Sequence, residues 1–497
     1  MRDSSPLRRL LAATLLAAPL LAGTALAAPR TDIVVGMQLE PPTLDPTSGA
    51  AAAIDEVVYA NVFEGLTRFG PDGEVLPALA ESWEPAPDNL SWVFHLRPGV
   101  KWHDGTAFTA EDVVFSFDRA MAPDSTNAQK QLFKGINEVT AIDDVTVEIG
   151  LDEPKGLFLS NLAWGDAVIV SPASIDTDKT QPVGTGPFKF SKWVQGDRIE
   201  LVRNPDYWGE PAKLERATFK FISDPTAAYA AMMSGDIDAF PVFPAPENLA
   251  QFQADSRFQV IVGSTEGETI LAMNNKRPPF DDIRVREAIG HAIDRKAIID
   301  GAMFGYGTPI GSHFAPHNAA YEDLTGLSGH DPEKAKALLA EAGVTGLKPT
   351  LVLPPPTYAR RGGEIVASQL RAVGIEPQIV NVEWAQWLEQ VFKNHDFDMT
   401  IISHTEPMDI EIYARPDYYF GYDDPVMRAL IRGLDFTSKD EERNELLRAA
   451  QERVATHFVN TFLFQLAKTG VADARLRGLW PNSPTQATDL TAVYWAE

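Results

Sequence analysis

The sequence predicts an α/β fold with mixed sheets, because predicted strands and helices alternate along the chain and one segment has the order strand, helix, strand. That segment has a strand over 350–353, a helix over 363–373 and a second strand over 375–382, the pattern of a βαβ unit. At 497 residues the chain has room for about two to four domains. No internal repeat and no low-complexity tract interrupts it.

Three further segments predict strands in the N-terminal third. The apolar run 33–35 opens the series. Apolar and polar residues alternate over 91–97 and again over 145–149, so every second side chain falls on the same face. Both alternating segments are therefore expected to be half-buried strands.

The helices have recognisable starts and ends. Thr109 with Asp112 three residues later predicts a capped helix start. Asp-Pro before an apolar stripe and Gly after it predict a helix over 332–343. Residues 284–303 are expected to form one helix, and 399–402 a further short strand.

Residues 1–27 predict a cleavable secretory signal peptide. They begin with arginines, continue with an apolar run over 10–21 and end with a small-x-small cleavage site at 25–27. The run is too short to span a bilayer, which argues against the alternative, an N-terminal membrane anchor. The pair Arg8-Arg9 leaves twin-arginine export open beside the general secretory route.

The absence of cysteine excludes several classes of site. A chain without cysteine has no acylation site for a lipid anchor, no disulfide, no thiolate metal site and no cysteine nucleophile. The net charge of −26 argues against nucleic acid and anionic membranes as partners. No stretch after the leader reaches the ~18 apolar residues of a membrane span. The mature chain is therefore expected to be free in the periplasm.

An ordered set of short motifs resembles the family 5 extracellular solute-binding proteins, the peptide- and nickel-binding group of ABC importers. Each motif is weak alone, but the set covers nearly the whole mature chain in the expected order. The motifs are Glu40-Pro41-Pro42-Thr43-Leu44-Asp45-Pro46, 65–68, 76–83, 96–105, 108–113, Gly184-Thr185-Gly186-Pro187-Phe188, Asn204-Pro205-Asp206-Tyr207-Trp208, Gly235-Asp236-Ile237-Asp238 and 285–289.

The resemblance implies a two-lobed periplasmic-binding-protein fold with a hinge between the lobes and an extra α+β domain on the N-terminal lobe. It implies a periplasmic substrate-binding protein that captures a peptide-like or other small polar ligand and delivers it to an ABC permease, as a monomer without a cofactor. The implied division is lobe I at 28–68, 186–265 and 465–497, the extra domain at 69–185, and lobe II at 266–464.

Two strand ends are the places to look for ligand contacts, because ligands of α/β sheets bind beyond the carboxyl ends of strands. In peptide-binding relatives an aspartate three residues before a Glu/Asp-Pro pair holds the peptide amine, and Glu406-Pro407 places Ser403 at that position. The arginine that holds the peptide carboxylate falls on Leu353. Both charged anchors would then be missing, which weakens the dipeptide interpretation, since unpaired buried charge is costly.

An acidic side chain at a shifted position is the alternative for the amine. The candidates are Glu406, Asp409 and Glu411. Aromatic rings suit peptide side chains, sugars and heterocycles. The candidate lining residues of this kind, each of which could instead be an ordinary core or surface residue, are Trp164, Tyr358, Trp384, Trp387, His404 and Tyr413.

No metal site is predicted from spacing. The nine histidines are scattered, and His313 and His317, four residues apart, lie among Pro and Gly where a helix is not expected. A secreted hydrolase is the rival from another class, but no Gly-x-Ser-x-Gly, His-Glu-x-x-His or phosphate-binding Gly-Lys-Ser/Thr pattern occurs. A receptor component that reports ligand to a sensor is the other alternative.

Overall fold

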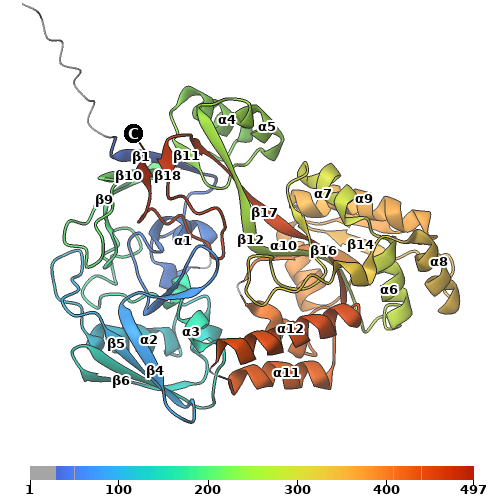
Figure 1. Ribbon diagram of the computed structural model, residues 1–497, viewed down its shortest axis with the longest axis horizontal. Coiled ribbons are helices and arrows are strands. Elements are labelled where there is room, and N and C mark those ends of the chain that lie inside the picture. The colour runs from blue at the N-terminus through green and yellow to red at the C-terminus, as the bar shows by residue number, and fades with distance from the viewer. Residues whose placement is uncertain (1–29, 50, 407, 438, 497) are drawn as a thin grey trace, which may run out of the picture.

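The computed structural model describes residues 30–49, 51–406, 408–437 and 439–496, with the side chains of residues 384 and 385 outside the description. The predicted leader, 1–27, lies outside the described residues. Figure 1 shows two halves joined by long crossing strands, with one half built from both ends of the chain. The predicted two-lobed α/β class is confirmed.

One mixed sheet of 11 strands runs through both halves in the order β15-β14-β16-β12-β17-β11-β1-β10-β9-β8, with β13 paired to β17. Its strands are β1 (Asp32–Met37), β8 (Phe188–Val194), β9 (Arg198–Arg203), β10 (Arg216–Phe221), β11 (Ala239–Phe240), β12 (Phe258–Met273), β13 (Thr308–Pro309), β14 (Thr350–Leu353), β15 (Gln378–Asn381), β16 (Met399–His404) and β17 (Asn460–Asp473).

The strands β12 and β17 connect the two lobes. They pair antiparallel along their whole length, from Phe258 opposite Asp473 to Ala272 opposite Asn460. The register shifts between Ser264 and Glu268, near the middle of the pair, and again between Thr269 and Ile270. A bulge bends a strand and increases its twist. The shift at Ser264–Glu268 lies within the two long strands that Figure 1 shows running between the halves.

Lobe I packs a buried cluster around β1, β9 and β10, with α1 (Ala52–Val58) against it. The strand predicted at 33–35 is β1, and Ile33 and Val35 are in this core. A smaller cluster lies beside α4 and α5. The remaining elements of this half are η1 (Pro46–Ser48), α4 (Pro225–Ser234), η4 (Pro246–Asn248), α5 (Leu249–Gln253), and the paired β18 (Leu476–Arg477) and β19 (Tyr494–Trp495).

The extra domain is a four-stranded antiparallel sheet, β4-β5-β7-β6, covered by α2 (Ala110–Met121). In β5 the side chains of Trp92, Phe94 and Leu96 are buried, as the alternation predicts. Asp112 accepts a hydrogen bond from the Thr109 N–H at 2.9 Å, which confirms the predicted helix start. The other elements are β2 (Thr67–Phe69), β3 (Val75–Pro77), β4 (Ala80–Pro85), β5 (Ser91–Leu96), η2 (Lys130–Phe133), β6 (Ile136–Asp143), β7 (Thr146–Leu151), α3 (Phe158–Asn161) and η3 (Gly165–Ala167).

Lobe II places helices on both faces of β14, β15 and β16. The βαβ unit is confirmed, since β14 and β15 are parallel and α9 connects them. A hairpin of α11 and α12 packs on the face nearest the extra domain (Figure 1). The elements are α6 (Ile283–Ala292), α7 (Arg295–Met303), η5 (Thr325–Ser328), α8 (Pro332–Glu341), α9 (Thr357–Ala372), α10 (Trp384–Trp387), η6 (Leu388–Lys393), η7 (Asp409–Ala414), α11 (Pro425–Asp435) and α12 (Asp440–Thr456).

Three sequence predictions need correction. The single helix expected over 284–303 is two helices, because Ile293 is extended and Asp294 caps a new start by accepting from the Ala297 N–H. The second strand of the βαβ unit is shorter than 375–382. Val145 lies just outside β7 and is exposed. Within the described residues, no helix combines the length and apolarity that a membrane crossing needs.

Candidate functional site

A cleft of about 650 Å³ lies between the extra domain and lobe II. Asp72, Glu74, Trp83, Trp92 and Lys155 line one wall, and the other wall comes from the β13–η5 loop, η7 and the α11–α12 hairpin. Small-molecule sites have volumes of this order, about 300–1,000 Å³. The cleft is therefore large enough for a small solute, and its lining is mixed in charge. The second wall is lined by His317, Asn318, Ala319, Met408, Asp435, Thr437, Asp440, Arg443 and Asn444.

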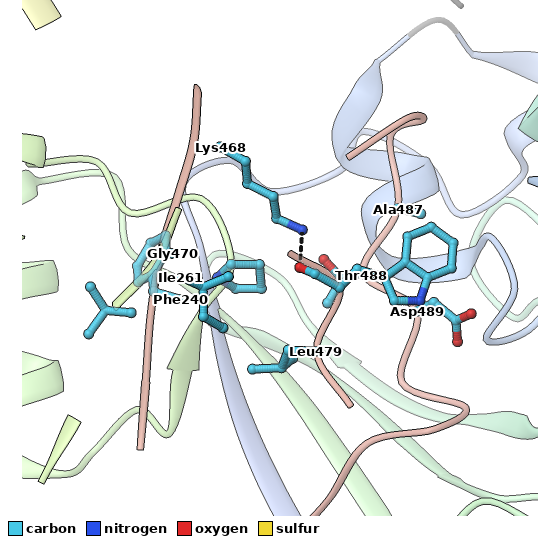
Figure 2. A pocket seen from close by; sticks show the side chains of 11 residues that line it. Phe240, Ile261, Lys468, Gly470, Leu479, Ala487, Thr488 and Asp489 are labelled. Atoms are coloured by element: carbon cyan, nitrogen blue, oxygen red, sulfur yellow. Dashed lines mark hydrogen bonds between the residues drawn. The ribbon is translucent and has the colours of Figure 1, made fainter. Parts of the chain in front are cut away.

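A second cavity, inside lobe I, is too small to hold a solute. Its volume is about 20 Å³, and Phe240, Leu479 and Ala487 surround it (Figure 2). The Lys468 ammonium donates to the Trp480 carbonyl at 2.9 Å, which ties β17 to the C-terminal segment. A cavity of this size has space for about one water molecule. The cleft between the extra domain and lobe II, with its larger volume and mixed polar and aromatic lining, is taken as the candidate binding site.

The two walls of the cleft meet at its rim. The Gly156 N–H of the extra domain donates to the Asp435 carboxylate at the end of α11. A Cβ placed on Gly156 would lie 1.9 Å from the Leu434 carbonyl oxygen. Only glycine permits this backbone approach. We call Gly156 with Leu434 and Asp435 the rim contact; it joins the extra domain to lobe II.

Behind the lobe II wall lies a buried group of two histidines and two carboxylates, which we call the histidine–carboxylate cluster: Glu268, His313, His404 and Asp409. Glu268 on β12 pairs across the sheet with His404 at the end of β16. Asp409 begins η7, directly after Met408, whose φ of 60° turns the chain sharply. His313 comes from the loop after β13. Four separate segments therefore converge on one place.

The contacts inside the cluster are close. His313 Nε2 and Asp409 Oδ1 are 2.7 Å apart, and His313 Nδ1 is 3.4 Å from a Glu268 oxygen. His404 Nδ1 lies 3.7 Å from Asp409 Oδ2. The other nitrogen of His404, Nε2, is 3.2 Å from the Tyr419 hydroxyl. An imidazole nitrogen and one oxygen from each carboxylate therefore lie together, a donor set suited to a divalent metal.

Burial and neighbouring charge shift the carboxyl pKa values in opposite directions. Burial raises the pKa of Glu268 well above its usual value, and the charge of Asp409 adds to this. Burial would also raise the pKa of Asp409, but His313 outweighs it and holds that pKa below the usual value. Burial lowers the pKa of His404. One carboxylate of the cluster is therefore held ionised, while the other is poised to keep a proton.

Several buried polar atoms in this region have no hydrogen-bond partner among the described residues. Buried polar atoms are nearly always paired, so a concentration of unpaired ones requires an explanation. Two belong to the cluster, two to the paired strands β12 and β16 beside it, and one to His317 on the cleft wall. The atoms are Glu268 Oε1, Thr269 Oγ1, His313 Nδ1, His317 Nδ1 and Ser403 Oγ.

The two positions predicted at strand ends differ in exposure. Ser403 is half-buried on β16, opposite Thr269 on β12, with Tyr358 beside its backbone. Leu353 ends β14 as expected, but its side chain is buried in the lobe II core and contacts Gly363. Ser403 is therefore partly exposed while its Oγ is buried, whereas Leu353 lies inside the lobe II core.

The three acidic candidates also differ in burial and in hydrogen-bond partners. Glu406 is exposed and accepts a hydrogen bond from the Thr405 N–H at 3.0 Å. Asp409 is in the cluster, with only 15% of its side chain exposed. Glu411 forms an ion pair with Arg415 on the surface of η7. Asp409 is thus the acidic candidate with a buried environment.

Among the aromatic candidates, His404 and Tyr413 join the cluster region. Tyr413 is buried, with its ring 5.2 Å from that of His313, and its hydroxyl accepts from Asn460 at 3.2 Å. Trp387 is buried and donates to Thr400 Oγ1 at 2.9 Å, so it is part of the lobe II core. Trp164 is half-buried against the extra-domain core. The side chain of Trp384 lies outside the described residues.

Burial raises the pKa of Tyr358, at the start of α9, to about 12.

The sequence did not predict Glu268 and His313 as site residues. Glu266 and Glu268 share one face of a strand by their period of two, and His317 Nε2 lies 2.5 Å from Glu266 Oε1. The alternation of Glu266 and Glu268, together with the spacing of His313 and His317, was the sequence signal that could have pointed to these residues. Only the tertiary fold brings the two segments together.

Comparison with known proteins gives a consistent result. The family model of bacterial extracellular solute-binding proteins, family 5, matches residues 74–420. Heme-binding protein A of Haemophilus influenzae is 33% identical over 66% of this chain and 65% of its own length. The chain thus spans just under two thirds of that relative. Glutathione-binding protein GsiB of Pectobacterium atrosepticum is 31% identical over 77% of this chain and 75% of its own.

Among solved structures, HbpA2 from Haemophilus parasuis superimposes with a TM-score of 0.85 and 25% identity. The superposition covers 94% of this chain and all of that one. It therefore includes both lobes and the extra domain.

Proposed function

Because the chain belongs to the bacterial extracellular solute-binding proteins of family 5, we propose that it is the periplasmic substrate-binding component of an ABC importer. It captures a small polar or peptide-like solute between its lobes and delivers the solute, chemically unchanged, to the permease. Residues 1–27 direct its export and are removed. The mature protein acts as a monomer.

The cleft carries this proposal. Its volume is large enough for a small solute, and its walls come from both lobe II and the extra domain. In the described part of the chain, the strands β12 and β17 cross the middle of the sheet between the lobes, with a register shift at the crossing. A few residues at such a connection can absorb the motion of hinge closure. The rim contact at Gly156 joins the extra-domain wall to the lobe II wall, where closure over a solute would bring the two together.

The lining favours a polar solute with both kinds of charge. Four carboxylates line the cleft: Asp72, Glu74, Asp435 and Asp440. Lys155 and Arg443 supply positive charge beside them, and Trp83 and Trp92 supply apolar surface. Glutathione, which the name of one relative states as its ligand, is a polar peptide-like molecule. A solute of that chemical class fits the charges of this cleft.

Simple dipeptides are not expected to be the preferred solute. Ser403 stands at the position of the amine-binding aspartate, and Leu353 at that of the carboxylate-binding arginine, with Leu353 inside the core. We expect a dipeptide such as Ala-Phe to bind weakly to the wild-type protein by calorimetry. Ser403→Asp should raise its affinity if the position is equivalent, and Ser125→Asp, far along the chain on the extra domain, is the matched control. Tight binding of Ala-Phe by the wild type would contradict this alignment.

Native mass spectrometry of the protein purified from the periplasm of its host tests the capture itself. The proposal predicts the mass of the mature chain plus one small molecule, which is released on unfolding. Calorimetric titration with that molecule should then give one site per chain. A released molecule that the refolded protein fails to bind, or converts to a different compound, would refute the proposal.

A further inference from the structure

We propose that Glu268, His404 and Asp409 bind a divalent transition-metal ion behind the lobe II wall of the cleft. One donor atom from each side chain lies within 4.8 Å of the other two. Mixed imidazole and carboxylate donors suit zinc and its first-row neighbours, whose bonds to such ligands are about 2.0–2.2 Å long. Three donors at this separation can therefore close on one ion with small side-chain adjustments.

The unpaired oxygen of Glu268 is a second, independent observation. Its side chain is 3% exposed and Oε1 has no hydrogen-bond partner among the described residues. The nearest imidazole, that of His313, presents Nδ1 at 3.4 Å, and that atom is also without a hydrogen-bond partner among the described residues. A buried carboxylate oxygen without a donor is costly. A cation between Glu268 and Asp409 would satisfy it.

Two of the proposed ligands, His404 and Asp409, have hydrogen-bond partners of the kind that surround the ligands of metal sites. The Tyr419 hydroxyl contacts His404 Nε2 at 3.2 Å, so Nδ1, the atom 3.7 Å from Asp409 Oδ2, is the one available to an ion. His313 Nε2 contacts Asp409 Oδ1 at 2.7 Å and leaves Oδ2 for the ion. Such outer partners fix the orientation of metal ligands. Tyr419 and His313 are therefore positioning residues.

Three protein ligands leave one position of a tetrahedral ion for water or for an atom of the solute. Met408, directly before Asp409, lines the cleft. The Asn318 amide contacts Met408 Sδ at 3.4 Å, and both residues lie on the lobe II wall. The ion would thus be reached from the cleft side. The metal site itself does not depend on the capture of a solute.

Equilibrium dialysis of the mature, chelator-treated protein against Zn²⁺ alone, followed by elemental analysis, tests the site. We expect one Zn²⁺ per chain. Glu268→Gln and His404→Gln should each weaken binding at least tenfold, and Tyr419→Phe should weaken it about tenfold. The matched controls are Glu266→Gln, two residues away on the same strand, and exposed His330→Gln, both with wild-type binding.

Co²⁺ alone supplies a spectroscopic readout that loss of structure would not imitate. The wild-type protein should give the visible absorption bands of four-coordinate Co²⁺, and Glu268→Gln should lose them while its far-ultraviolet circular dichroism stays unchanged. If Glu268→Gln fails to fold, His404→Gln and Tyr419→Phe decide the question. Absence of stoichiometric Zn²⁺ binding by the wild type, or equal losses in the Glu266 and His330 controls, would overturn the proposal. Either result leaves the solute-capture proposal intact.

Discussion

Each lobe buries a group of acidic side chains, and the two groups differ in what stands beside them. In lobe II, His313 contacts Asp409 at 2.7 Å and holds the pKa of that carboxyl below its usual value. Near the base of lobe I, burial and then the neighbouring Asp166 raise the pKa of Asp55 well above its usual value. Similar burial is thus accompanied by opposite pKa shifts at Asp409 and Asp55, because Asp409 has an imidazole partner at hydrogen-bond distance and Asp55 has a second carboxyl beside it.

This difference indicates two roles. A carboxylate held ionised behind a cleft wall can interact with a cation or a polar solute. A carboxyl that keeps its proton is a neutral hydrogen-bonding group and contributes to the packing between α1 and η3.

Removal of the His313 imidazole should have the largest effect on the free energy of unfolding at neutral pH. In His313→Ala, Glu268 and Asp409 stay buried without that partner, and breaking a buried pair in this way costs about 3 kcal/mol. We expect the free energy of unfolding in urea to fall by about that amount. The control His330→Ala removes an exposed ring and should leave it unchanged. Equal stability of His313→Ala and wild type would show that the pair is not important for the fold.

The pH dependence of stability should distinguish the two groups. Burial raises the pKa of Asp166 to about 7 from the usual 3.8, so the folded state keeps a proton that the unfolded chain has released. Its contribution to stability is complete below the unfolded pKa and is lost as the pH rises through about 7. In Asp166→Asn, the fall in unfolding free energy over this window should be smaller than in wild type by about 4 kcal/mol.

Asp409→Asn is the counterpart with the opposite sign. The depressed pKa of Asp409 contributes stability above the unfolded value, which is lost as the pH falls through the lower folded value. This variant should therefore flatten only the acid side of the profile. Urea unfolding at a series of pH values measures both variants. Identical profiles for the two would contradict the assigned directions.

Trp387→Phe should affect stability and leave binding unchanged. The ring is buried in the lobe II core and donates to Thr400, so we expect a loss of about 1–2 kcal/mol from the missing hydrogen bond and volume. Affinity for the co-purified solute should stay as in wild type. A selective loss of affinity with unchanged stability would place Trp387 in the binding site instead.

Trp384 is predicted from the sequence to line the site, so Trp384→Ala should weaken solute binding by about 1–3 kcal/mol.

The rim contact should show the smallest effect. A methyl group on Gly156 would meet the Leu434 carbonyl, so Gly156→Ala should hold the walls apart and weaken solute binding several-fold. Gly326→Ala is the matched control, since a Cβ there meets no atom within 4 Å. Small-angle scattering of the solute-bound variant should report a larger radius than that of the bound wild type. An unchanged radius and affinity would remove the rim contact from the closure mechanism.

Local patterns predicted the local elements well. The alternation over 91–97 gave β5 because a strand at a sheet face has a period of two, and Thr109 with Asp112 gave the start of α2. The break at Ile293 was missed because the apolar stripe continues through it, although Asp294 and Ala297 form a new helix start. In the site, His404 and Asp409 were predicted from one nearby stretch. Glu268 and His313 were missed because their proximity depends on pairing between distant strands.

The distance between the two lobes in solution is the most direct test of closure. The chain has no cysteine, so Asp88→Cys on the extra domain and Glu445→Cys on α12 would carry the only two spin labels. Both positions are exposed. Capture between closing lobes predicts a broad or long distance distribution without solute and a shorter, narrower one when the co-purified solute is returned. A distribution that stays the same while calorimetry shows the solute to be bound would contradict it.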